Sequence, residues 1–179
     1  MTQRQFSVAG RAERGFTLVE LMITVLIAAI LLMIAAPSFK RLMSRTDVGQ
    51  ASNEMLADLA LARTQAATLG RTVCVVANGG DWNDGWQVIA DMDRSGVCDD
   101  TGAAAHLRSH AALGSGFTVS SGATTEVAYR ATGSLKGASD VDIKFCRKAD
   151  SEAQRVLVKV RASGSAAAYR DNSANGPNC

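Results

Sequence analysis

The distribution of apolar residues divides the chain into a basic start, a long apolar run and a mixed remainder. Residues 1–15 are polar and basic, and the 21 residues from Phe16 to Ala36 are apolar except for Thr17, Glu20 and Thr24. At about 1.5 Å per residue, a helix of this length is roughly 30 Å long, which matches the hydrocarbon core of a bilayer. The pattern predicts a leader over residues 1–15 and a transmembrane helix over residues 16–39.

After Pro37 the apolar residues recur at intervals of three and four, which is the spacing of one helical face. This stripe consists of Val48, Ala51, Met55, Leu59, Ala62, Ala66 and Leu69, and the opposite face is expected to carry Arg45, Asn53, Asp58, Arg63 and Thr64. Gly70 is suited to end the helix. We therefore expect one helix from Phe16 to Leu69 that is kinked at Pro37, the alternative being two separate helices.

Beyond Gly70 the chain consists of short, often β-branched segments between clusters of glycine, asparagine and serine, which is typical of strands. The predicted strands are Thr72–Ala77, Trp86–Asp91, Phe117–Ser120, Thr125–Arg130, Val141–Cys146 and Arg155–Arg161. In the last of them, Val156, Val158 and Val160 mark one buried face. The pattern predicts an α+β fold in which the amphipathic helix of residues 40–70 packs on a small antiparallel β-sheet domain, residues 71–179.

All four cysteines, Cys74, Cys98, Cys146 and Cys179, follow the apolar run. An even number of cysteines is typical of disulfides in an oxidising compartment, which places residues 71–179 outside the cytoplasm. Of the three possible connectivities we expect Cys74–Cys98 and Cys146–Cys179. A cleaved secretory signal is the alternative for the N-terminus, but its apolar region is normally roughly 7–15 residues long.

Overall charge and composition exclude several classes of function. The net charge is +2, and without residues 1–15 the chain keeps 19 − 3 = 16 basic and 17 − 1 = 16 acidic side chains, so bulk charge predicts no partner. With two histidines and no phosphate-binding loop or nucleophile–base pattern, we predict neither an enzyme nor a cofactor.

One short acidic motif raises the question of a calcium site. Asp91, Asp93 and Ser95 before Gly96 resemble the start of a calcium loop, but Gly102 occupies the slot of the closing glutamate. Asp99 and Asp100 are possible substitutes, and a plain acidic turn is the preferred interpretation.

The aromatic and imidazole side chains have similarly simple interpretations. His106 and His110 face together only on a helix, in a region that indicates strand or loop, so no zinc site is predicted. Trp82 and Trp86 are interpreted as aromatic anchors of the core rather than as a ligand platform.

Glu20 is the one acidic residue inside the apolar run. An ionised carboxylate at mid-membrane costs about 2.5–3.5 kcal/mol, and the run contains no lysine, arginine or histidine to pair with it. Cleavage between Gly15 and Phe16 would create an α-amino group at the head of the helix. A neighbouring copy, shifted along the axis, would then present that amine to Glu20. We therefore predict that Glu20 fixes the register of an assembly.

The stretch RGFTLVELMITVLIAAILLMIAAPSF resembles the signature of type IV pilins and type II secretion pseudopilins. The resemblance implies that a prepilin peptidase cuts after Gly15 and methylates Phe16. It also implies that Glu20 pairs with the N-terminal amine of a neighbour and that Pro37 marks a partial unwinding of the helix in the filament.

A second resemblance covers ASNEMLADLALARTQAATLGRTVCV and WNDGWQVIADMDRSG, which are similar to the GspH/FimT group of minor pilins and pseudopilins. It implies an inner-membrane protein with a periplasmic C-terminal domain that helps to initiate or cap a type IV pilus or a type II secretion pseudopilus. The implied partners are other pilins, the prepilin peptidase and the inner-membrane assembly platform.

The competing interpretation is a receptor for double-stranded DNA, because some FimT-type members take up DNA in natural transformation through a basic GRxR-like motif. Candidate contacts here are Lys144, Lys159, Arg161 and Arg170, with Lys159 and Arg161 expected on one strand face. At the expected place the chain has SGSAAAYR, in which only Gly164 and Arg170 resemble the motif, at the wrong spacing. A solvated basic face is therefore preferred. A simple membrane-anchored periplasmic module is a third possibility, which leaves Glu20 unexplained.

Overall fold

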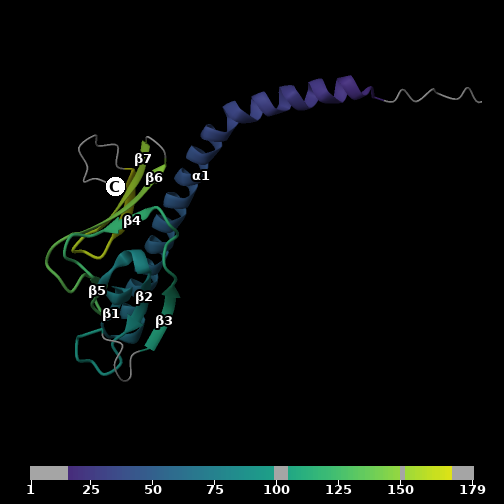
Figure 1. The fold of residues 1–179 in the computed structure, drawn as a ribbon. Coiled ribbons are helices and arrows are strands. Elements are labelled where there is room, and N and C mark those ends of the chain that lie inside the picture. Colours follow the sequence, from purple (N-terminus) through teal and green to yellow (C-terminus); the bar gives the residue numbers. More distant parts are fainter. Residues whose placement is uncertain (1–15, 99–104, 150–151, 171–179) are drawn as a thin grey trace, which may run out of the picture. The chain divides into compact units, whose positions relative to one another are not determined.

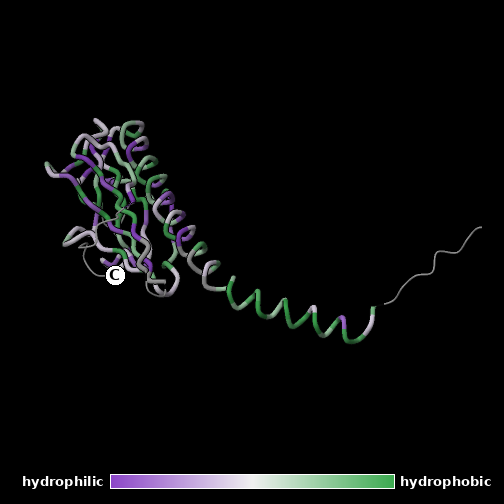
Figure 2. Tube along the Cα trace, turned by 90° about the horizontal axis from the view of Figure 1, so that it is seen from above, coloured by the Kyte–Doolittle hydropathy of each residue, from purple (hydrophilic) through white to green (hydrophobic). Residues whose placement is uncertain are grey.

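The computed structural model describes residues 16–98, 105–149 and 152–170. The chain forms two compact units, residues 1–39 and residues 40–179. One helix, α1 (Leu18–Leu69), contributes to both and continues through Pro37, which confirms one helix rather than two (Figure 1). Its segment Leu18–Ala36 has a mean hydropathy of 2.8 and no buried residues, so it is long and apolar enough to cross a membrane (Figure 2).

The C-terminal half of α1 packs on the globular domain through the predicted stripe. Val48, Ala51, Met55, Leu59, Ala62 and Ala66 are all buried, whereas Leu69 is exposed at the end of the helix. Gly70 has φ +64°, and the N–H of Arg71 donates to the carbonyl of Ala66 at 3.3 Å. This six-to-one bond is the Schellman arrangement, in which a residue with positive φ ends the helix, as expected for Gly70.

The strands form two antiparallel sheets rather than one. The first has the order β3 (Ala105–His110), β2 (Trp86–Ala90), β1 (Val73–Ala77), β5 (Glu126–Tyr129). The second has the order β4 (Phe117–Ser120), β6 (Val141–Ala149), β7 (Glu152–Val160), β8 (Ala166–Arg170). Two short 3₁₀ turns, η1 (Asn78–Gly80) and η2 (Trp82–Asp84), join β1 to β2. The α+β fold is confirmed, and β3 and β8 are two strands that are not among the six predicted ones.

The core lies between α1 and the inner faces of both sheets. Its largest fully buried side chains include Trp86, Tyr129 and Phe145, and the rings of Trp86 and Phe145 meet edge to face at 6.3 Å. Trp82 is also buried, and its indole N–H donates to the carbonyl of Thr124 at 2.8 Å. Both tryptophans are therefore core anchors.

A disulfide joins Cys74 of β1 to Cys98, with the two Cα atoms 6.0 Å apart, as the sequence predicted. It fastens the loop after β2 to the outer side of the first sheet, where Cys74, Cys98 and Ala128 form a small buried cluster. Cys146 is also disulfide-bonded. Its expected partner, Cys179, lies outside the described residues, so that pairing stays a prediction.

Candidate assembly site

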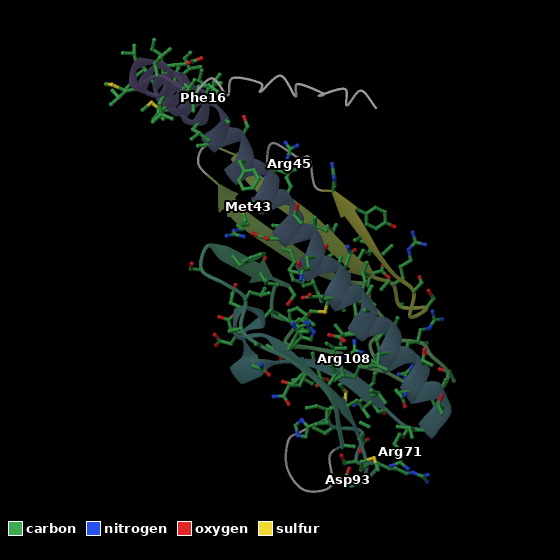
Figure 3. All side chains as sticks on the ribbon, turned by 90° about the vertical axis from the view of Figure 1, so that its right-hand side faces the viewer. Phe16, Met43, Arg45, Arg71, Asp93 and Arg108 are labelled. Atoms are coloured by element: carbon green, nitrogen blue, oxygen red, sulfur yellow. A yellow bond between two sulfur atoms is a disulfide. The ribbon has the colours of Figure 1, made fainter. Side chains whose placement is uncertain are left out.

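The N-terminal end of α1 is shaped by a threonine cap. The hydroxyl oxygen of Thr17 accepts the backbone N–H of Glu20 at 3.2 Å, so Thr17 satisfies one of the free amides of the first turn. The helix therefore begins at Leu18, and Phe16 lies before it with 82% of its surface exposed (Figure 3). Gly15, the other residue of the predicted cleavage junction, lies outside the described residues.

Glu20 is the third residue of α1, and its side chain is exposed. With Thr17 it forms the sequence T-x-x-E of a capping box, and a carboxylate in the first turn interacts favourably with the helix dipole. The helix dipole therefore reduces the cost of a carboxylate at this position. These interactions supply no positive charge, because α1 has no basic residue before Lys40.

Asp58 is a residue of α1 whose predicted position was wrong. It was expected on the polar face of the helix, but it is 1% exposed and faces the first sheet. Its two carboxylate oxygens accept separate hydrogen bonds, one from Trp86 Nε1 and one from Arg108 Nη1, both at 2.8 Å. Asp58 lies three residues after Met55 and four before Ala62, a helical spacing that is typical of the buried face. It was predicted on the polar face because its side chain is charged.

His110 adds a second contact beside Asp58. Its imidazole stacks on Trp86, with centroids 4.4 Å apart and planes inclined by 19°, and its Nε2 lies 3.4 Å from Glu54 Oε2 of α1. His110 and His106 lie on strand β3, consistent with the strand or loop that the sequence indicated.

Two further contacts tie α1 to the second sheet and to the loops. Arg147 of β6 forms an ion pair with Asp47 of α1, and its guanidinium lies 5.1 Å from the centroid of the Phe117 ring. Arg63 Nε donates to the carbonyl of Gly133 at 2.9 Å. We call the four α1 residues of these contacts, Asp47, Glu54, Asp58 and Arg63, the polar bridges of the helix.

The four candidate DNA contacts do not form one group. Lys144 and Lys159 lie on the outer face of the second sheet, opposite the buried side chains of Phe145 and Val158, and Lys159 Nζ is 3.6 Å from Asp142 Oδ1. Strand β7 ends at Val160, so Arg161 lies in the turn that follows, where its N–H donates to the carbonyl of Ser165 at 2.8 Å. Arg170 pairs in register with Val156 and lies on the opposite face of the sheet from the two lysines.

The acidic loop after β2 is organised by its own backbone. Asp91 is buried and its carboxylate accepts the N–H groups of Ser95 at 3.2 Å and Gly96 at 2.7 Å. The Ser95 N–H also donates to Asp93, and this hydrogen bond holds the pKa of the Asp93 carboxyl below its usual value. This arrangement is that of an acidic turn, while Asp99, Asp100 and Gly102 lie outside the described residues.

Comparison with protein families gives two matches. The model of the family "Type II transport protein GspH" matches residues 51–164, and that of the "Prokaryotic N-terminal methylation motif" matches residues 10–36. Among curated protein sequences, none matches the chain.

Two solved structures have a similar fold, both crystal forms of the type IV minor pilin FimU of Pseudomonas aeruginosa PAO1. In space group P65 it is 22% identical with a TM-score of 0.53, over 68% of this chain and 91% of that one. In space group P21 the identity is 22% and the TM-score 0.55, over 74% of this chain and 94% of the other.

Proposed function

Because the chain belongs to the family of type II transport protein GspH and carries the prokaryotic N-terminal methylation motif, we propose that it is a minor subunit of a type IV pilus or type II secretion pseudopilus. In this proposal a prepilin peptidase cleaves between Gly15 and Phe16 and methylates Phe16. The processed chain stays in the inner membrane with its globular domain in the periplasm until it joins the filament, where it helps to initiate or cap assembly.

The observation that carries the proposal is the arrangement at the start of α1. Phe16 lies outside the helix, Thr17 caps it, and the exposed Glu20 follows in the first turn with no cation in its own span. The methylated amine of Phe16 on one subunit is a suitable partner for Glu20 of a neighbour, because pairing with a positive charge in the bilayer offsets part of the cost of a lone carboxylate. Pro37 lets the helix unwind locally during packing.

The test is to replace Glu20 in the full-length protein. Glu20→Ala should leave membrane insertion intact, measured by carbonate extraction, and should strongly reduce recovery of the subunit in sheared filaments. Thr24→Val is the matched control, because Thr24 lies one turn further along the same span and its hydroxyl donates only to the carbonyl of Leu21 at 2.8 Å. Equal recovery of Glu20→Ala and wild type would contradict the register argument.

A second candidate function is binding of double-stranded DNA, favoured by the shared outer face of Lys144 and Lys159. Phosphate contacts by a few lysines give sequence-independent binding that weakens as salt rises. The full-length protein in nanodiscs would be titrated into fluorescein-labelled duplex DNA across a salt series and read by anisotropy. Loss of binding in the double variant Lys144→Ala, Lys159→Ala supports this function, and no binding at low salt excludes it. Arg170→Ala is the control, since Arg170 lies on the opposite face.

A further inference from the structure

The part of α1 that follows the apolar run begins where the uncharged stretch ends. Residues 21–39, directly after Glu20, contain no charged side chain. At about 1.5 Å per residue they measure about 29 Å, close to the roughly 30 Å of a hydrocarbon core. In an anchored chain, the residues from Lys40 onwards are therefore expected at the level of the lipid headgroups. We call residues 40–45 the juxtamembrane segment.

Large apolar side chains of this segment are not covered by the described part of the globular domain. Leu42 and Met43 are 60% and 53% exposed, and Phe39, which directly precedes them, is 63% exposed. Residues three and four positions apart lie on one side of a helix, so these three form one apolar face. The buried stripe of α1 begins only at Val48, which is 1% exposed.

The juxtamembrane segment also has three basic residues and no acidic one, Lys40, Arg41 and Arg45, so its formal charge is +3. At 100° per residue these three occupy helix positions on the side away from the apolar face. Figure 3 shows Arg45 on α1, where it is exposed. The next acidic residue along the helix, Asp47, forms an ion pair with Arg147 of β6, which balances its charge.

This combination indicates which surroundings suit the segment. A helix with an apolar face and a basic face is typical of the boundary between headgroups and acyl chains. Apolar side chains enter that boundary, whereas lysine and arginine extend their charged ends to the phosphate groups. A zwitterionic headgroup has no net charge, while a headgroup such as that of phosphatidylglycerol is negative. The charge of the segment therefore favours an anionic lipid surface.

From these observations we propose that the juxtamembrane segment binds the headgroups of anionic phospholipids. The phosphate oxygens accept hydrogen bonds from its basic residues, and Leu42 and Met43 enter the bilayer boundary beside them. The argument for this occupant is the continuity of the segment with the apolar run and the match of opposite charges. The inference rests on the membrane anchoring in the proposed function, and it does not depend on filament assembly.

The test is hydrogen–deuterium exchange of the full-length protein in nanodiscs of two compositions, phosphatidylcholine alone and phosphatidylcholine with added phosphatidylglycerol. The anionic lipid should slow exchange of the amides of residues 41–47 by about threefold or more. The difference between the two compositions should shrink as the salt concentration rises, because salt screens the attraction between charges. This readout is local, so the basic residues of the leader do not contribute to it.

Variants separate the segment from bulk charge. The double variant Arg41→Gln, Arg45→Gln should lose most of the difference between the two lipid compositions. The matched control is Lys144→Gln, Lys159→Gln, which removes the same formal charge from the outer face of the second sheet and should keep the difference.

Three results would overturn the proposal. The first is equal exchange of residues 41–47 in the two compositions. The second is an equal loss of the difference in the control variant, which would assign it to bulk charge. The third is the same slowing by inorganic phosphate added to neutral nanodiscs, which would indicate a site for free anions. A chain that does not enter nanodiscs would contradict the anchoring itself, and this inference with it, whereas an embedded chain without lipid dependence contradicts only this inference.

Discussion

At the scale of single residues, Asp58 is the side chain on which the docking of α1 depends most directly. Asp58→Ala leaves the buried indole N–H of Trp86 without its acceptor, so we expect a loss of about 1–3 kcal/mol in the free energy of unfolding. Asp58→Asn keeps an acceptor oxygen and should lose less. Urea unfolding followed by tryptophan fluorescence measures both, with Asn53→Ala on the exposed face as a control within about 0.5 kcal/mol of wild type.

Tyr129 predicts a loss of stability at high pH. Burial raises the pKa of its phenol from 10.0 to about 12, because the folded protein disfavours the phenolate. Because the pKa is higher in the folded than in the unfolded state, the free energy of unfolding is unaffected by this group below pH 10. It falls as the pH rises from 10 to 12, where the unfolded protein ionises more readily than the folded one. The loss amounts to at most about 3 kcal/mol.

The same residue offers a direct check at neutral pH. The Tyr129 hydroxyl is buried and has no hydrogen-bond partner among the described residues. Tyr129→Phe should therefore be neutral or stabilising at pH 7, since it removes an unpaired polar atom, and should flatten the decline between pH 10 and 12. Unfolding midpoints at pH 7 and pH 11 test both statements. A clearly destabilised variant at pH 7 would show that the hydroxyl is satisfied.

At the scale of elements, the Cys74–Cys98 disulfide ties the acidic loop to β1 across 24 residues of sequence. The double variant Cys74→Ala, Cys98→Ala should lower the free energy of unfolding by about 2–4 kcal/mol. Amide exchange should accelerate first in residues 91–98, because the disulfide is their covalent link to the sheet. Unchanged exchange there would mean that the hydrogen bonds of Asp91 are sufficient to hold the loop.

The positions of helices and strands could be predicted from the local sequence where buried and exposed residues alternate regularly. The stripe from Val48 to Ala66 and the six predicted strands were visible because one face of each is apolar. Strands β3 and β8 were not among the six because most of their residues are exposed. Ala166–Arg170 is also rich in alanine, which has low β-propensity. The division into two sheets depends on pairing between segments far apart in sequence, such as Val73 with Tyr129, which periodicity does not encode.

For the candidate site, too, the sequence predicted what depends on neighbouring residues and missed contacts between distant ones. The T-x-x-E start of α1 and the family signature could be recognised because their residues are adjacent in the sequence. The partners of Asp58 could not be recognised, because Arg108 is fifty positions away and belongs to an exposed edge strand.

At the scale of the whole molecule, processing should change the chain in a way that mass spectrometry measures. The purified mature protein should begin at Phe16, lack residues 1–15 and carry one additional methyl group on its N-terminus. Gly15→Val should block cleavage and leave the leader attached, because the proposed cleavage follows this glycine. A full-length mass for the wild-type protein from its native host would contradict the processing step.

The polar bridges have a mechanical consequence. Asp47 and Arg63 are 16 residues apart, or about 24 Å along the helix, and Glu54 and Asp58 lie between them. A force pulling on α1 along its axis is therefore borne by all four attachments in parallel, together with the buried stripe. The interface between the domain and its helix is therefore loaded in shear. Such an interface resists separation better than one in which the contacts bear the force one after another.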